Sequence, residues 1–116
     1  MGNLKLLLLE AEPVIAAHIL NLLEGTGCDT FHACDTREAL DWCAQHRPQL
    51  ALLNFHADGL ALAFKLRDQF AIKSCFVSGS RQKDIPAGSL YEGNFTWLQK
   101  PFTPVQFKKA LAEFLP

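Results

Sequence analysis

The sequence lacks the cysteine spacing and the charge excess that mark several common functions. No Cys-x-x-Cys pair or zinc-ligand spacing is present, so the four cysteines are expected to be small buried thiols in a reducing compartment: Cys28, Cys34, Cys43 and Cys75. The net charge is -1, with basic and acidic residues scattered and nearly balanced. This balance argues against binding to nucleic acid or to an anionic membrane surface.

Long apolar runs are also missing. The opening leucine run ends at Glu10 and is too short to span a bilayer, and it fits neither a signal peptide nor a membrane anchor. We therefore expect a cytoplasmic protein. The chain has 116 residues, of which 49% are hydrophobic, and shows no repeat, linker or low-complexity tract. These features predict a single domain over residues 1–116.

The apolar pattern predicts alternating strands and helices. Strands are expected at residues 4–9, 30–33, 50–54, 74–77 and 95–98. Helices are expected from Pro13 to before Gly25, from Asp35 to before Pro48, from after Gly59 to near Phe70, and after Thr103. A fourth, short or irregular crossover helix is expected near Pro86. This alternation predicts an α/β fold with a doubly wound, five-stranded parallel sheet, flavodoxin-like in the order 2-1-3-4-5, and five flanking helices.

Helical spacing also predicts which side chains face the core. The expected set is Ile15, Ile19, Leu22, Leu23, Ala39, Leu40, Cys43, Leu60, Phe64, Leu66, Val105, Leu111, Phe114 and Leu115. Asp35 with Glu38, and Thr103 with Gln106, have capping-box spacing at two helix starts. Gly59 is expected to serve a turn.

The third strand ends at Asn54, where ligands bind in an open α/β sheet. A neutral carboxamide cannot act as a nucleophile or a general base, as an aspartate there could. Glu10 and Glu12 close the first strand beside a helix N-terminus, so they could form a divalent cation site or favour the helix electrostatically and cap it. His56 is a weaker candidate for a metal ligand with these acids. Ser78 either places a hydroxyl at the same edge or forms a serine-glycine turn.

The acidic cluster after the first strand, the single side chain closing the third, Ser78, Trp97 and the run Lys100-Pro101-Phe102 together resemble the response regulator receiver domain. The resemblance covers nearly the whole chain. It implies that Asn54 stands at the phosphoacceptor aspartate, Glu10 at the first metal-binding acid and Ala11 at the second, with Glu12 one residue beyond. It also implies a phosphorylation-reporting hydroxyl at Ser78, a switch aromatic at Trp97, a phosphate-pairing lysine at Lys100 and a cis bond at Pro101.

The resemblance thus implies a degenerate receiver, or pseudo-receiver, of two-component phosphorelay signalling. We expect no enzymatic activity, no cofactor, weak or absent Mg²⁺ binding at Glu10, and no phosphorylation at Asn54. A sensor kinase, another regulator or an output domain would bind the face of the fourth helix, fifth strand and last helix, and Arg81 to Gly93 would be the most mobile internal segment. Lys100 is expected to pair with Glu10. The alternatives are a receiver phosphorylated at a substitute acid such as Asp58, or a flavodoxin-like ligand carrier.

Overall fold

A computed structural model describes residues 4–54, 57–78, 95–100 and 102–112, without the side chains of Ala57, Asp58 and Ser78. The strands are β1 (Lys5–Leu9), β2 (Asp29–Ala33), β3 (Leu50–Asn54), β4 (Lys73–Ser78) and β5 (Thr96–Gln99). The helices are α1 (Pro13–Leu23), α2 (Thr36–His46), α3 (Ala57–Phe70) and α5 (Pro104–Ala112). The predicted strands and these helices are therefore present, with small shifts at their ends.

The five strands form one parallel sheet in the order β2-β1-β3-β4-β5, which confirms the predicted topology. The short strand of mixed polarity, β2, lies at one edge. The described residues contain four helices. The further helix expected near Pro86, and the mobility expected for Arg81 to Gly93, concern residues 79–94, which lie outside the described part of the chain.

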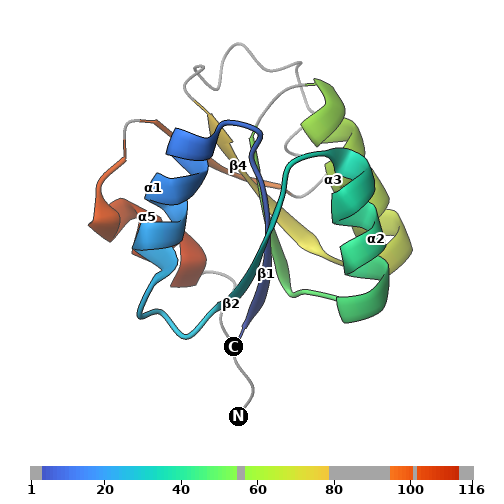
Figure 1. Ribbon diagram of the computed structural model, residues 1–116, viewed down its shortest axis with the longest axis horizontal. Coiled ribbons are helices and arrows are strands. Elements are labelled where there is room, and N and C mark those ends of the chain that lie inside the picture. Colours follow the sequence, from blue (N-terminus) through green and yellow to red (C-terminus); the bar gives the residue numbers. More distant parts are fainter. Residues whose placement is uncertain (1–3, 55–56, 79–94, 101, 113–116) are drawn as a thin grey trace.

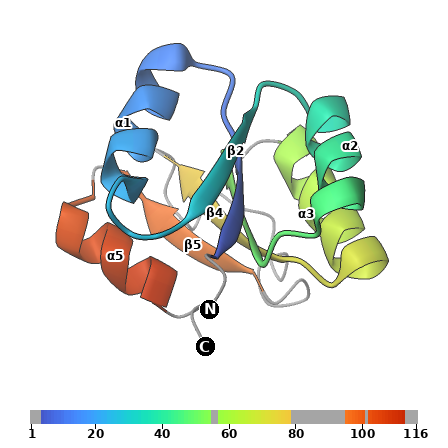
Figure 2. The same cartoon turned by 60° about the horizontal axis from the view of Figure 1, so that its bottom comes forward.

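Helices cover both faces of the sheet, with α1 and α5 on one side and α2 and α3 on the other (Figures 1 and 2). Successive residues of a strand point to opposite faces, so the leucines of β1 divide between two cores. Leu6 and Leu8 pack with α1 and α5, whereas Leu7 and Leu9 pack with α2 and α3. This explains why β1 is an unbroken leucine run instead of an alternating one.

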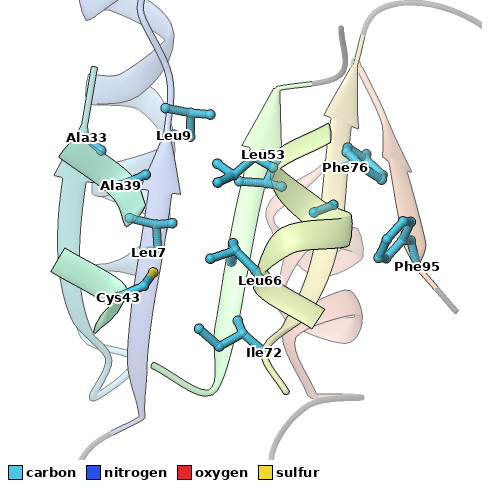
Figure 3. Close-up of a cluster of buried hydrophobic side chains, with 13 residues drawn as sticks. Leu7, Leu9, Ala33, Ala39, Cys43, Leu53, Leu66, Ile72, Phe76 and Phe95 are labelled. Atoms are coloured by element: carbon cyan, nitrogen blue, oxygen red, sulfur yellow. The ribbon is translucent and has the colours of Figure 1, made fainter. Parts of the chain in front are cut away.

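Figure 3 shows the core on the α2 and α3 side, where leucines of β1 and β3 and Phe76 of β4 meet helical side chains. Most predicted core positions in the described residues are buried or half-buried there or in the second core. Leu62 and Ala63 of α3 are buried although the helical pattern did not single them out. Val105 was predicted to face the core, and this prediction is wrong because its side chain is 75% exposed. Phe114 and Leu115 lie outside the described residues.

Both predicted capping motifs form. The Asp35 carboxylate accepts a hydrogen bond from the backbone N–H of Glu38 at 2.8 Å, and so starts α2. At α5 the motif is reciprocal, because the Thr103 hydroxyl accepts from the Gln106 N–H at 3.1 Å and the Gln106 side chain accepts from the Thr103 N–H at 2.9 Å. These bonds satisfy N–H groups that a helix leaves without partners at its first turn.

The start of α3 differs from the prediction. The helix begins at Ala57, so Gly59 lies inside its first turn and not in the preceding turn. A Cβ atom at Gly59 would lie 2.5 Å from the backbone oxygen of Asn54, which is closer than real Cβ atoms approach. Gly59 therefore has no room for a side chain, because the first turn of α3 lies against the backbone at the end of β3.

None of the helices in the described residues is long and apolar enough to cross a membrane.

Candidate functional site at the carboxyl edge of the sheet

The strand register brings the predicted site residues to one edge of the sheet. Leu9 pairs with Leu53, so Glu10 and Asn54 follow at equivalent positions of neighbouring strands. Asn54 pairs with Val77, the residue before Ser78. Ser78 pairs with Gln99, so Lys100 comes next on β5. The carboxyl ends of four parallel strands thus converge, which is where this class of sheet places its ligands.

Glu10 is the buried acid of this edge, with 2% of its surface exposed. Its backbone is held by the edge strand: the Glu10 N–H donates to the Ala33 carbonyl at 3.2 Å, and the Glu10 carbonyl accepts from the His32 ring Nε2 at 2.6 Å. The sequence analysis did not find this role of His32, since a single histidine on a polar edge strand carries no recognisable motif. These two hydrogen bonds hold the backbone of Glu10 in place at the end of β1.

Ala11 and Glu12 do not share the burial of Glu10, since both are exposed. Glu12 occupies the N-cap position of α1, but its side chain makes no capping hydrogen bond. The predicted side-chain cap is therefore absent at this helix start. In the described residues no group of three or more acidic, histidine or cysteine side chains is placed to hold a metal ion, and His56 lies outside those residues.

Asn54 is half-buried at the end of β3. Its backbone is in register with Val77 of β4, and its side chain offers a carbonyl oxygen and an NH₂ group but no ionisable acid. The backbone of Asp58 belongs to the first turn of α3. An acyl phosphate cannot form on the side chain of Asn54, because a carboxylate oxygen is needed as the nucleophile.

Trp97 lies on β5, half-buried against the α2 and α3 core, with its ring centroid 6.3 Å from that of Phe76 and tilted by 47°. Ser78 is the last residue of β4, in register with Gln99. The side chain of Ser78 and the whole of Pro101 lie outside the described part of the structure.

Lys100 is half-buried and lines a groove between α1 and the segment that joins β5 to α5. The groove has a volume of about 340 Å³, and its other lining residues are Val14, Ile15, His18, Ile19 and Phe102. The expected ion pair of Lys100 with Glu10 is wrong, because the described residues show no such pair within 4.0 Å. Glu10 is buried at the end of β1, whereas Lys100 lines the groove beside α1. The sequence alone does not show that these two side chains lie apart.

The cysteines differ in burial, which corrects the prediction that all four are buried. Cys43 and Cys75 are buried, Cys28 is half-buried, and Cys34 is exposed where the chain leaves β2. Burial raises the pKa of the Cys43 thiol from 9.0 to about 11. The unfolded chain then ionises this thiol first, so its contribution should lower the free energy of unfolding as the pH rises from about 9 to 11.

We expect iodoacetamide at pH 8 to modify Cys34 of the folded protein and to leave Cys43 unmodified. The rise in the pKa of Cys43 from 9.0 to about 11 lowers its thiolate fraction at pH 8 about 100-fold, and burial also keeps the reagent from its sulfur. Peptide mapping by mass spectrometry after timed quenching measures both rates. In guanidinium chloride the two cysteines should react alike, which provides the control. Equal rates in the folded protein would contradict the assigned burial.

Comparison with known proteins agrees with this geometry. Residues 6–112 match the family described as the response regulator receiver domain. No match was found among curated proteins.

Solved structures of receiver domains superpose closely on the chain. The signal receiver domain of an HD domain-containing protein from Pseudomonas fluorescens Pf-5 is 22% identical with a TM-score of 0.90, and the match covers 99% of this chain and 88% of that one. A CheY-like response regulator receiver domain from Methylobacillus flagellatus is 21% identical with a TM-score of 0.84, over 98% and 100% of the two chains. NtrX from Brucella abortus, solved in complex with ADP, is 23% identical with a TM-score of 0.86, over 99% of this chain and 26% of that one. At these identities the structures support the shared fold.

Proposed function

The chain belongs to the response regulator receiver domain family, and we propose that it is a pseudo-receiver that signals through protein contacts without aspartyl phosphorylation. The observation that carries the proposal is the amide of Asn54 at the end of β3, where phosphoryl transfer would require a carboxylate. The domain would act as a binding partner in a two-component pathway and not as an enzyme. A cytoplasmic location remains our expectation.

The acidic residues beside Asn54 support the same proposal. Mg²⁺ prefers near-octahedral oxygen coordination and usually bridges carboxylates and phosphate oxygens. In this chain Glu10 is buried at the strand end, Ala11 has no oxygen in its side chain, and Glu12 is exposed at the start of α1. A single well-placed carboxylate should hold Mg²⁺ weakly or not at all. We therefore propose a domain that works without a metal cofactor.

Other positions at the edge keep the residue types that the family uses, namely Ser78, Trp97, Lys100 and Pro101. We propose that they serve the resting shape of the domain and no longer report phosphate. A sensor kinase, another regulator or an output domain would contact the face that contains β5 and α5. The half-buried side chain of Trp97 belongs to β5, one of the elements that such a partner would contact.

The first test is incubation of the wild-type protein with Mg²⁺ and acetyl phosphate, followed by intact-mass measurement. We expect no phosphoryl adduct, because Asn54 cannot form an acyl phosphate. A family member with its acceptor aspartate, treated in parallel, confirms that the donor is active. A stoichiometric adduct mapped to Asp58 would instead support a receiver with a substitute acceptor.

The second test asks whether partner binding is the same with and without a phosphodonor. The wild-type protein is used to capture partners from native cells, with and without acetyl phosphate and Mg²⁺. Equal capture of the same protein in both samples is expected. Capture that requires the phosphodonor would contradict the proposal. An ultraviolet-visible spectrum of the same preparation tests the remaining alternative, a flavin carrier, because a bound flavin would absorb in the visible range.

A further inference from the structure

The groove beside α1 combines apolar walls with one lysine. Its lining runs from the buried Ile19, through the half-buried Ile15 and Phe102, to Val14, which is 82% exposed. A single exposed valine is common on protein surfaces, but this one continues an apolar lining that starts in the core. The groove therefore offers apolar surface that a bound molecule would remove from water.

The wall opposite α1 is held in place by a buried neighbour. The ring centroid of Phe102 lies 5.6 Å from that of the buried Phe107, with the two rings stacked at 20°. On its other side it lies 6.1 Å from the ring of His18, which comes from α1. Helices α1 and α5 cover the same face of the sheet, so this contact joins the two sides of the groove (Figure 2). The groove is thus largely formed before any ligand binds, as small-molecule sites usually are.

The charge of the groove has one sign. Lys100 carries a positive charge, and none of the described residues that line the groove is acidic. Within the described part of the chain no carboxylate lies within 4.0 Å of the Lys100 amine. The ring nitrogens of His18 add hydrogen-bonding groups at the same lining. A half-buried ammonium without a carboxylate beside it favours an anion, because a charged pair of hydrogen-bonding groups is stronger than a neutral one.

The size of the groove favours a small molecule over a protein. Its volume of about 340 Å³ falls within the range of about 300–1,000 Å³ that is usual for small-molecule sites. A stable protein interface uses about 20–30 residues on each side. Only six described residues line this groove. Its apolar part is one short stretch of α1 and a single aromatic ring, which matches the body of a small ligand.

From these observations we propose that the groove binds a small carboxylic acid with an apolar body. The carboxylate would pair with Lys100, and the apolar body would lie between α1 and Phe102. One lysine matches the single charge of a carboxylate, whereas a phosphate dianion calls for several charged donors. Lys100 directly follows Gln99, the last residue of β5, so the ligand would contact the carboxyl edge of the sheet. The proposal goes beyond the proposed function and does not depend on it.

Three probes with the same alkyl chain test the proposal on the wild-type protein, without phosphodonor or Mg²⁺. Octanoate should bind saturably, with a Kd on the order of 0.1–1 mM for a ligand of this size. Octanol lacks the charge and should bind about 10-fold more weakly, and octylammonium, with the opposite charge, should show no saturable binding. Two-dimensional amide NMR measures all three titrations. The shifts that saturate should lie in residues 14–19 and at Phe102.

Variants separate the charge from the apolar contact. Lys100→Met should weaken octanoate about 10-fold and leave octanol unchanged, because only the carboxylate loses its partner. Val14→Asp should weaken octanoate about 10-fold or more, since it places a like charge on the apolar wall. Val14 is exposed, so thermal unfolding of this variant should be unchanged. Lys108→Met removes an exposed lysine of α5 that does not line the groove, and this matched control should bind like the wild type.

Three outcomes would overturn the proposal. The first is octanoate that gives no saturable shifts in the wild-type protein, and the second is octylammonium that binds as tightly as octanoate. The third is an octanoate Kd that is the same in the wild type, Lys100→Met and Val14→Asp, since the acid would then bind elsewhere. None of these results bears on phosphorylation, which the acetyl phosphate experiment tests separately.

Discussion

The double variant Ala11→Asp with Asn54→Asp should accept one phosphoryl group from acetyl phosphate in the presence of Mg²⁺, whereas the wild-type chain accepts none. Asn54→Asp supplies a carboxylate at the end of β3, and Ala11→Asp supplies a second acid directly after Glu10. The metal neutralises charge that develops on the phosphoryl group during its transfer to the carboxylate. Restoring both residues should therefore turn an inert site into a reactive one.

The single variants decide whether acceptor and metal act as one unit. Residues that act together have strongly non-additive effects, so Asn54→Asp alone should remain almost unphosphorylated and Ala11→Asp alone should gain nothing. Intact mass measured at several times, with and without Mg²⁺, compares all four proteins. Full phosphorylation of the Asn54→Asp variant would show that Glu10, with or without Glu12, already supports the metal.

Gly59→Ala should lower the free energy of unfolding by about 1–3 kcal/mol, the usual range for overpacking. The new Cβ would lie 2.5 Å from the Asn54 oxygen, and this neighbour is backbone, which cannot rotate away. Helix propensity alone predicts the opposite sign, since alanine is favoured over glycine by about 1 kcal/mol in a helix interior. Urea unfolding with a fixed m-value distinguishes the two outcomes, and a stabilised variant would show that the contact can relax.

Gly25→Ala is the matched control for Gly59→Ala, because a Cβ atom at Gly25 would meet nothing within 4 Å. Gly25 has a φ of +81°, where a side chain costs about 1–2 kcal/mol through backbone strain. The two substitutions should therefore both destabilise, but only Gly59→Ala should disturb the end of β3. Amide chemical shifts around Asn54 should move in Gly59→Ala and stay unchanged in Gly25→Ala.

The parts of the fold that local chemistry determines were predictable from the sequence. The bounds of β3 follow from an apolar run that ends at one polar residue, and the start of α5 follows from the reciprocal capping motif of Thr103 and Gln106. The strand order came from the general flavodoxin-like fold and not from the local pattern, because parallel strands can be arranged in several orders with the same local pattern. The register of those strands then brings Glu10, Asn54 and the end of β5 to one edge.

The errors concern contacts between elements that are distant in sequence. Glycine is common in turns, but Gly59 lies in α3, where a side chain would collide with the backbone oxygen of Asn54 at the end of β3. Val105 has an apolar side chain at helical spacing, yet the side of α5 that packs on the core is formed by Phe107 and Leu111, with Ala110 partly buried against them. Cys34 is exposed because the chain leaves β2 there, directly after the buried Ala33. Each of these outcomes depends on what lies across the sheet or beyond its edge, and a local pattern does not contain that information.

The division of the β1 leucines between two cores has a consequence for how the chain can vary. Leu7 and Leu8 are neighbours in sequence, but Leu7 belongs to a cluster with Ile72 and Leu8 to a cluster with Phe107. Energetic coupling between mutations follows shared packing, so a change at Leu8 should be compensated more readily from Phe107, near the end of the chain, than from the adjacent Leu7. Odd and even positions of β1 should therefore vary together with different sets of residues, one set in each core. Either face of the sheet can be repacked with little effect on the other, and the helices that meet partners on one side can change while the opposite core is preserved.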